Sequence, residues 1–256
     1  MDFSGDFGLW QRKLAEGLEG VARRMSAFTA LAVESGQAVL DVGCGGGHLV
    51  RELALAVGDG GRAVGLDINA EQIGVARDLC AGLPAAELVE GQATNMPFDD
   101  GAFDGVVSIQ ALEYIPDVDS ALTEVRRVLK PGGKAAFISV LWDHWRFHGP
   151  DSELNERVLG AWRAHCTHQM LPIEMPRKLA ATGFGGAFCR PIAFMNNSLH
   201  ENAFAFWASK LAAGFAVGQG VPEVDARRWQ DQLAQADKEG RFAFVSVPVL
   251  TTATAI

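Results

Sequence analysis

The 256-residue sequence predicts a doubly wound α/β fold, in which helices cover both faces of a mainly parallel sheet. Between residues 38 and 140, short apolar runs alternate with segments of amphipathic helical periodicity. The runs are apolar at consecutive positions, which is typical of parallel strands buried on both faces. Right-handed crossover connections then arrange such strands as a Rossmann-like sheet.

Strands and helices can be assigned in order along the first part of the chain. The strands are predicted at 38–42, 63–67, 86–90, 103–109 and 134–140. The helices are predicted at 9–34, 46–57, 70–81 and 118–129, where apolar residues recur at three- and four-residue steps. We therefore expect an N-terminal helical lid segment over 1–36 and a Rossmann-like core over 37–140.

The regular alternation ends after residue 140. Helices are predicted at 152–165, 175–182, 199–216 and 222–239, and strands at 185–193 and 241–250. We expect the last strand to join the sheet in antiparallel orientation, as edge strands of mainly parallel sheets often do. Region 141–256 then completes the sheet and carries helical lid insertions over the ligand face, at 141–183 and 195–240.

Composition and charge narrow the class of ligand. The chain is 48% apolar and 21% charged, as soluble globular proteins are, and it lacks an apolar run of about 18 residues that could cross a membrane. Its net charge is −9, and basic pairs such as Arg23-Arg24 are isolated and expected on solvated helix faces. Nucleic acid is therefore disfavoured and a small molecule favoured. The segment from Met1 to Trp10 lacks the features of a secretory signal peptide, so we expect a cytoplasmic protein.

The cysteines are spread along the chain, at Cys44, Cys80, Cys166 and Cys189. None forms a C-x-x-C pair, which disfavours both a disulfide framework and a structural zinc site. We therefore expect reduced thiols and no bound metal.

The loop after the first strand carries the clearest functional signal. Asp41 ends that strand, glycines follow at Gly43, Gly45 and Gly47, and a helix begins at once. Such a turn lets the backbone approach a ligand and presents helix N–H groups to it. A dinucleotide-binding loop would have its third glycine where this chain has His48. The Asp41 carboxylate would repel a pyrophosphate but attract an ammonium group, so the loop favours S-adenosylmethionine (SAM) over NAD.

The second strand supports the same ligand. It ends at Asp67, which is placed to accept hydrogen bonds from both hydroxyls of a ribose. An alternative interpretation is helix capping, in which Asn69 is the N-cap of the next helix and Gln72 lies three residues further on. Ile68 is expected to pack against the adenine face.

Four segments together resemble the core of class I SAM-dependent methyltransferases, small-molecule type, and in particular the ubiquinone/menaquinone-biosynthesis (methyltransferase type 11) group. They occur in the order and with the spacing of that family, and they read Val39-Leu40-Asp41-Val42-Gly43-Cys44-Gly45-Gly46-Gly47, Gly65-Leu66-Asp67, Met96-Pro97-Phe98-Asp99-Asp100-Gly101-Ala102-Phe103-Asp104 and Arg127-Val128-Leu129-Lys130-Pro131-Gly132-Gly133.

The resemblance implies a SAM site built from these loops, with S-adenosylhomocysteine (SAH) as the product. It implies that Cys44, within the glycine loop, also binds the cofactor. It places Ser108 and Gln110, at the end of the fourth strand, beside the methionine moiety. It also places Gln92 and Ala93 beside the adenine. Relatives usually carry an aspartate where this chain has Gln92, whose carbonyl can still accept the adenine amino proton.

The methyl acceptor has a weaker signature. Methyl transfer from a sulfonium is an in-line displacement with a neutral leaving group, so alignment matters most and a base is needed only for some acceptors. Two candidate catalytic residues are Tyr114, after the fourth strand, and His144, in the aromatic stretch 142–148. That stretch suits the wall of a pocket for a planar or hydrophobic acceptor. Apolar residues from Phe204 to Phe215 could line the pocket or form a core.

Other classes of protein stay open. A SAM-binding protein that does not transfer methyl groups, such as a cyclase or a non-catalytic subunit, would carry the same core motifs. An NAD-dependent oxidoreductase is disfavoured by Asp41 and His48. The sequence leaves the oligomeric state undecided, with a homodimer among the options.

Overall fold

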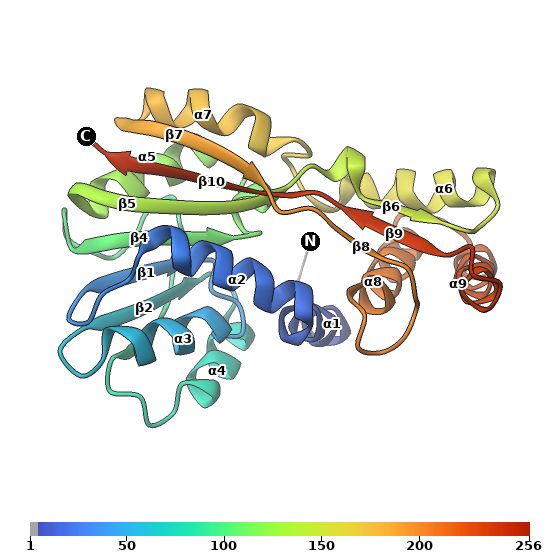
Figure 1. Ribbon diagram of the computed structural model, residues 1–256, viewed down its shortest axis with the longest axis horizontal. Coiled ribbons are helices and arrows are strands. Elements are labelled where there is room, and N and C mark those ends of the chain that lie inside the picture. The colour runs from blue at the N-terminus through green and yellow to red at the C-terminus, as the bar shows by residue number, and fades with distance from the viewer. Residues whose placement is uncertain (1–4) are drawn as a thin grey trace.

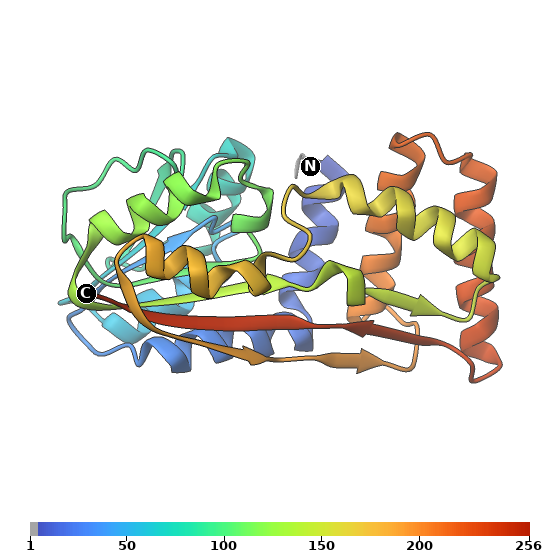
Figure 2. The ribbon, with the colours of Figure 1, turned by 90° about the horizontal axis from the view of Figure 1, so that it is seen from above.

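The computed structural model describes residues 5–256, so the first four residues of the predicted lid segment 1–36 lie outside the described part. The chain forms a large sheet with its helices and, beside it, a smaller part built from helices and a second sheet (Figure 1). Extended segments of the large sheet run on toward the second sheet, so the two parts share long extended connections (Figure 2). No helix of residues 5–256 is long and apolar enough to cross a membrane.

The large sheet has the strand order β3-β2-β1-β4-β5-β10-β7. Its strands are β1 Ala38–Val42, β2 Arg62–Asp67, β3 Ala86–Glu90, β4 Phe103–Ile109, β5 Leu129–Val140, β7 Phe184–Pro191 and β10 Pro248–Ala255. Strands β1 to β5 pair in parallel, and β10 lies antiparallel between β5 and β7. The predicted Rossmann-like, mainly parallel sheet with an antiparallel C-terminal strand is therefore confirmed.

Helices cover both faces of this sheet, as the doubly apolar strands require. They are α2 Leu18–Leu31, α3 His48–Val57, α4 Ala70–Leu79, α5 Val118–Val128 and α7 Leu171–Ala181. Helices α5 and α7 contribute to the buried cluster on one face, and α2 and α3 to the cluster on the other (Figure 2). Because α7 packs on the sheet, the prediction that 141–183 is wholly a lid insertion is wrong.

The N-terminal segment is not the single helix predicted over 9–34. It forms α1 Gly5–Glu16 and α2, separated at Gly17, whose backbone is extended at φ −68 and ψ 168. A Cβ on Gly20 would lie 2.4 Å from the carbonyl oxygens of both Leu14 and Ala15, so only glycine allows α2 to approach the end of α1. The apolar periodicity continues through the break, and for this reason it does not reveal the break.

The smaller part contains helices α6 Ser152–Trp162, α8 Phe204–Gly218 and α9 Glu223–Lys238. They pack against an antiparallel sheet of order β6-β9-β8, formed by β6 Arg146–His148, β9 Ala243–Ser246 and β8 Phe194–Asn196. The predicted strand 241–250 is in fact two strands, since β9 belongs to this sheet and β10 to the large one. Pro248 cannot donate a ladder hydrogen bond, which suits the first position of β10.

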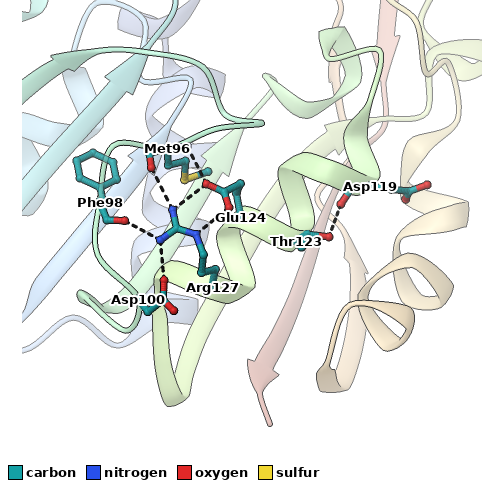
Figure 3. A network of polar contacts seen from close by, with 7 residues as sticks. All are labelled: Met96, Phe98, Asp100, Asp119, Thr123, Glu124 and Arg127. Carbon is teal, nitrogen blue, oxygen red and sulfur yellow. Dashed lines mark hydrogen bonds and ion pairs between the residues drawn. The ribbon is translucent and has the colours of Figure 1, made fainter.

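Arg127 ties the loop before β4 to helix α5 (Figure 3). Its guanidinium donates to the Met96 carbonyl at 3.0 Å, the Phe98 carbonyl at 2.6 Å and the Asp100 carboxylate at 2.9 Å. It also forms two bonds with the Glu124 carboxylate, at 2.7 and 2.8 Å. Two of the family-like segments, 96–104 and 127–133, therefore hold the loop in place and do not reach the cavity described below.

Replacing Arg127 with methionine is expected to lower the free energy of unfolding by about 1–3 kcal/mol, because two carbonyls and two carboxylates lose their donor. The melting temperature should fall by a few degrees, whereas the affinity for SAH should stay unchanged. Arg227→Met is the control, since the Arg227 side chain is 72% exposed and bridges only Glu223. Equal melting temperatures for the two variants would contradict the proposed stabilising role of Arg127.

Candidate functional site

A cavity of about 780 Å³ opens at the carboxyl ends of the parallel strands. Ligands of open α/β sheets bind at this edge, and the volume lies in the upper part of the usual range for ligand sites. One end is lined by the loops after β1, β2 and β3, and the other by aromatic side chains of the smaller part. Helices α1 and α2 form a further wall. The cavity is therefore lined by residues of the predicted core and of all three segments predicted as lids, 1–36, 141–183 and 195–240.

The glycine loop forms the floor beside β1. Gly43 has φ +75, and a Cβ there would lie 2.2 Å from the Ala111 Cβ, so no side chain fits. Gly43, Cys44 and Gly45, which were predicted to bind the cofactor, line the cavity. Gly47 is not part of the lining that the described residues form, and it packs instead against α4 at Ala76. Its role is to bring α4 close to the loop.

Asp67 is held in position by the backbone around it. Its Oδ2 accepts from the Gly45 N–H at 2.8 Å, and its Oδ1 accepts from the Asn69 N–H at 2.9 Å. Asp67 lines the cavity, and each of its carboxylate oxygens can accept a further hydrogen bond. Asn69 also caps α4 by accepting from the Gln72 N–H at 3.1 Å, so helix capping and ribose binding are compatible. Ile68 lines the cavity and is 68% exposed, which leaves its side chain free to cover a planar base.

Asp41 is a buried carboxylate in the same wall. It is 3% exposed and is the last residue but one of β1, close enough to Asp67 at the end of β2 for their charges to interact. Burial, and then the neighbouring Asp67 charge, raise the pKa of Asp41 to about 8. Over residues 5–256, no Lys or Arg nitrogen lies within ion-pair distance of Asp41. The two carboxylates together favour a ligand that brings a positive charge.

The ends of β3 and β4 contribute three of the four predicted cofactor residues. Gln92 and Ala93 line the cavity, and so does Gln110, whose backbone has φ +51. Ser108 is 1% exposed, lies outside the lining and donates its hydroxyl to the Val42 carbonyl at 2.8 Å. Its contribution is to join β4 to β1 beneath the site.

The two candidate catalytic residues have different positions. Tyr114 ends the 3-10 turn η1 Leu112–Tyr114 and lines the cavity. Burial, and then the Glu113 carboxylate beside it, raise the pKa of Tyr114 well above its usual range, so its hydroxyl keeps its proton. His144 is exposed and lies outside the lining. The turn η2 Trp142–His144 leaves Trp142 and the following Trp145 in the lining and His144 exposed to solvent, so the His144 side chain is not part of the cavity wall.

Sequence reasoning missed several lining residues, among them Arg23 and Trp162, whereas Phe204 belongs to the stretch that was expected to line the pocket or form a core. The prediction that Arg23 and Arg24 are solvated is wrong, because they are only 6% and 8% exposed. Their position in α2 between the buried Gly20 and Ala27, on the same helix face, is the signal that could have revealed this.

The fold and the cavity have the arrangement that the resemblance implied, with a glycine loop after β1 and an acid after β2. Residues 40–137 match the family model described as "Methyltransferase domain". The resemblance predicted from the sequence is therefore confirmed.

Two relatives and one solved structure show the extent of the similarity. An uncharacterized 37.1 kDa protein in transposon TN4556 of Streptomyces fradiae is 32% identical over 213 residues, which cover 80% of this chain and 60% of that protein. The demethylmenaquinone methyltransferase of Staphylococcus epidermidis is 41% identical over 110 residues, covering 43% of this chain and 46% of the relative. The chain thus spans less than two thirds of the length of each.

The solved structure is Haemonchus contortus phosphoethanolamine N-methyltransferase 2 in complex with SAM. It aligns with a TM-score of 0.61 at 18% identity, covering 91% of this chain and 52% of that one. At this identity the likeness concerns the fold, and it extends beyond the matched family segment into the smaller part.

Proposed function

We propose that this protein is a SAM-dependent methyltransferase that acts on a small aromatic or hydrophobic acceptor in the cytoplasm. One observation carries the proposal: a single cavity has two carboxylates and a glycine loop at one end, and a wall of aromatic side chains at the other. The first end suits a positively charged nucleoside, and the second suits a flat apolar molecule. Relatives that bear methyltransferase names support this assignment.

The residues present fit the cofactor. Asp67, oriented by two backbone N–H groups, would hold the ribose hydroxyls. Asp41 would face the positive charge of the methionine part, which supplies the cation that this buried carboxylate lacks. Gln92, Ala93 and Ile68 would surround the adenine. When bound, SAM supplies a methyl group whose leaving group is a neutral thioether.

The chain's own contribution is alignment and the exclusion of water. Trp142, Trp145 and Trp162 form an apolar wall opposite the glycine loop, and α2 covers the cavity from the side. Holding two reactants in line in this way can supply about 7–11 kcal/mol of the barrier reduction. Tyr114, which keeps its proton, would donate a hydrogen bond to an acceptor oxygen and would not act as a base.

The first test is calorimetric titration with SAH, followed by incubation with methyl-labelled SAM and a panel of aromatic acids, phenols and quinols. We expect SAH to bind and label to appear in at least one member of the panel. If the wild-type protein does not bind SAH, the proposal fails. If SAH binds but no acceptor in the panel is labelled, the alternative of a SAM-binding protein without methyl transfer is favoured.

Replacing Tyr114 with phenylalanine is expected to lower kcat/KM for the acceptor found in this panel about tenfold, since one hydrogen bond to the acceptor is lost. The affinity for SAH should stay within about threefold, because Tyr114 lies on the acceptor side of the cavity. A large loss of SAH affinity, or unchanged turnover, would refute this role for Tyr114.

A further inference from the structure

Arg23 is a buried cation in the cavity wall without an ion pair. It is 6% exposed, and its guanidinium donates to the Gln110 side-chain carbonyl and lies 4.9 Å from the centre of the Phe204 ring. Within the described chain, no carboxylate oxygen lies within ion-pair distance of it. Arg24, the other arginine in the wall, is paired with Glu52 at 2.9 Å. The two neighbours therefore differ in whether their charge is already balanced.

The charge of Arg23 is not balanced by a carboxylate at ion-pair distance in the described part of the chain. Burial lowers the pKa of Arg23 to about 10, and the more distant Glu19 and Glu113 carboxylates offset only part of that effect, so the side chain stays charged at neutral pH. Its Nε has no hydrogen-bond acceptor among residues 5–256. A buried charge without a partner is costly, and an anion from outside would remove that cost.

The aromatic side chains that line the same cavity as Arg23 indicate what kind of molecule would bring the anion. Trp145 and Trp162 stack with their ring centres 5.2 Å apart and an interplanar angle of 19°, and Trp142 lies beside them. The indole Nε1 atoms of Trp142 and Trp162 are buried and have no acceptor in the described part of the chain. This end of the cavity thus combines flat apolar walls with unused donors, which suits an aromatic ring that carries an oxygen anion.

Arg23 donates to Gln110, which was predicted to lie beside the methionine moiety, but its other contacts favour an anion on the acceptor side. The charge of Arg24 acts on Asp41, in the cofactor end, whereas Arg23 interacts with Glu113 and Tyr114. Its ring contact, Phe204, belongs to α8 of the smaller part.

We propose that Arg23 binds the carboxylate or phenolate of an aromatic acceptor and thereby selects anionic aromatic substrates. The assignment of this anion to a methyl acceptor rests on the proposed function. The planar guanidinium can form paired hydrogen bonds with a carboxylate, which a lysine ammonium cannot reproduce.

The experiment compares 2-naphthoate with 2-naphthamide, two probes of the same shape that differ in charge. Binding is followed by quenching of tryptophan fluorescence, because Trp142, Trp145 and Trp162 line the cavity. It is measured with and without saturating SAH, for the wild type and for Arg23→Met and Arg23→Lys. Arg62→Met is the matched control, since the Arg62 guanidinium also lies over a ring, 5.4 Å from the centre of Phe103, but away from the cavity.

We expect the wild type to bind naphthoate about tenfold more tightly than naphthamide. Arg23→Met should weaken naphthoate binding about tenfold and leave the affinities for naphthamide and SAH within about threefold. Arg23→Lys should keep part of the preference for naphthoate, and Arg62→Met all of it. If Arg23→Met does not fold, the affinities of the wild type and of Arg23→Lys for the two probes still test whether Arg23 binds the anion.

Equal affinity for the two probes, or no binding of either, would overturn the proposal. So would a loss of SAH affinity in Arg23→Met that matches the loss of naphthoate affinity, because the anion would then be the carboxylate of the cofactor. Failure of the wild type to bind SAH is a separate result. It would remove the proposed function, whereas the comparison of the two probes without SAH would still test the anion site.

Discussion

Replacing Asp67 with alanine is expected to weaken the binding of SAH at least about a hundredfold. The side chain offers two acceptors to the ribose, and hydrogen bonds to a charged group contribute about 1.5–3 kcal/mol each. The same substitution leaves the Gly45 and Asn69 N–H groups without their acceptor, so the glycine loop also loses a contact that shapes it. Calorimetric titration with SAH measures the effect.

A matched control tests whether the loss of any carboxylate at the end of a strand would weaken SAH binding. Glu90 ends β3 and pairs in register with Asp67, but its side chain is exposed and does not line the cavity. Glu90→Ala should therefore bind SAH like the wild type. An SAH affinity of Asp67→Ala within about tenfold of the wild type, in a protein that melts normally, would show that Asp67 does not hold the cofactor.

The cofactor end of the cavity could be predicted from the sequence because each of its parts is local. A strand, a turn and the start of a helix are contiguous in the chain, so the spacing of Asp41 and the glycines already specifies what lies together. Asp67 comes from the neighbouring parallel strand, whose carboxyl end must lie at the same edge of the sheet. No long-range packing had to be known to place these residues.

The acceptor end could not be predicted in this way, because its residues come from elements that are distant in the sequence. Arg23 lies in α2, Trp162 in α6 and Phe204 in α8, and only tertiary packing brings them to one cavity. The local spacing of Arg23 with Gly20 and Ala27 indicates a buried helix face but does not say which cavity that face borders. In the aromatic stretch, the geometry of a single 3-10 turn decides that Trp142 faces inward and His144 outward.

The predicted strand 241–250 shows the same limit in the backbone. Both β9 and β10 are half apolar extended segments, and only Val247 separates them. Alternation of apolar residues predicts a strand but does not say which sheet it joins. The separate three-stranded sheet, and with it the smaller part as a packed unit, follows from long-range pairing with β6 and β8.

Replacing Asp41 with asparagine is expected to stabilise the ligand-free protein at pH 8.5 and to weaken SAH binding about 30-fold or more. The pKa of Asp41 is raised from 3.8 to about 8 in the folded protein. A raised carboxyl pKa gives a contribution to stability that is complete below about pH 4 and is lost as the pH rises through 8. Asparagine does not ionise, so the variant should not lose this contribution.

The measurement is a pair of melting curves at pH 6 and pH 8.5, with SAH titrations at the higher pH. The variant should gain about 0.5–2 kcal/mol over the wild type at pH 8.5 and less at pH 6. Its SAH affinity should fall because the ligand's positive charge loses a buried partner, a loss of about 2–5 kcal/mol. If the variant is less stable than the wild type at pH 8.5, or binds SAH equally well, this interpretation of Asp41 is wrong. With these results, the stability that Asp41 costs the empty protein would be explained by its attraction for the positive charge of the cofactor.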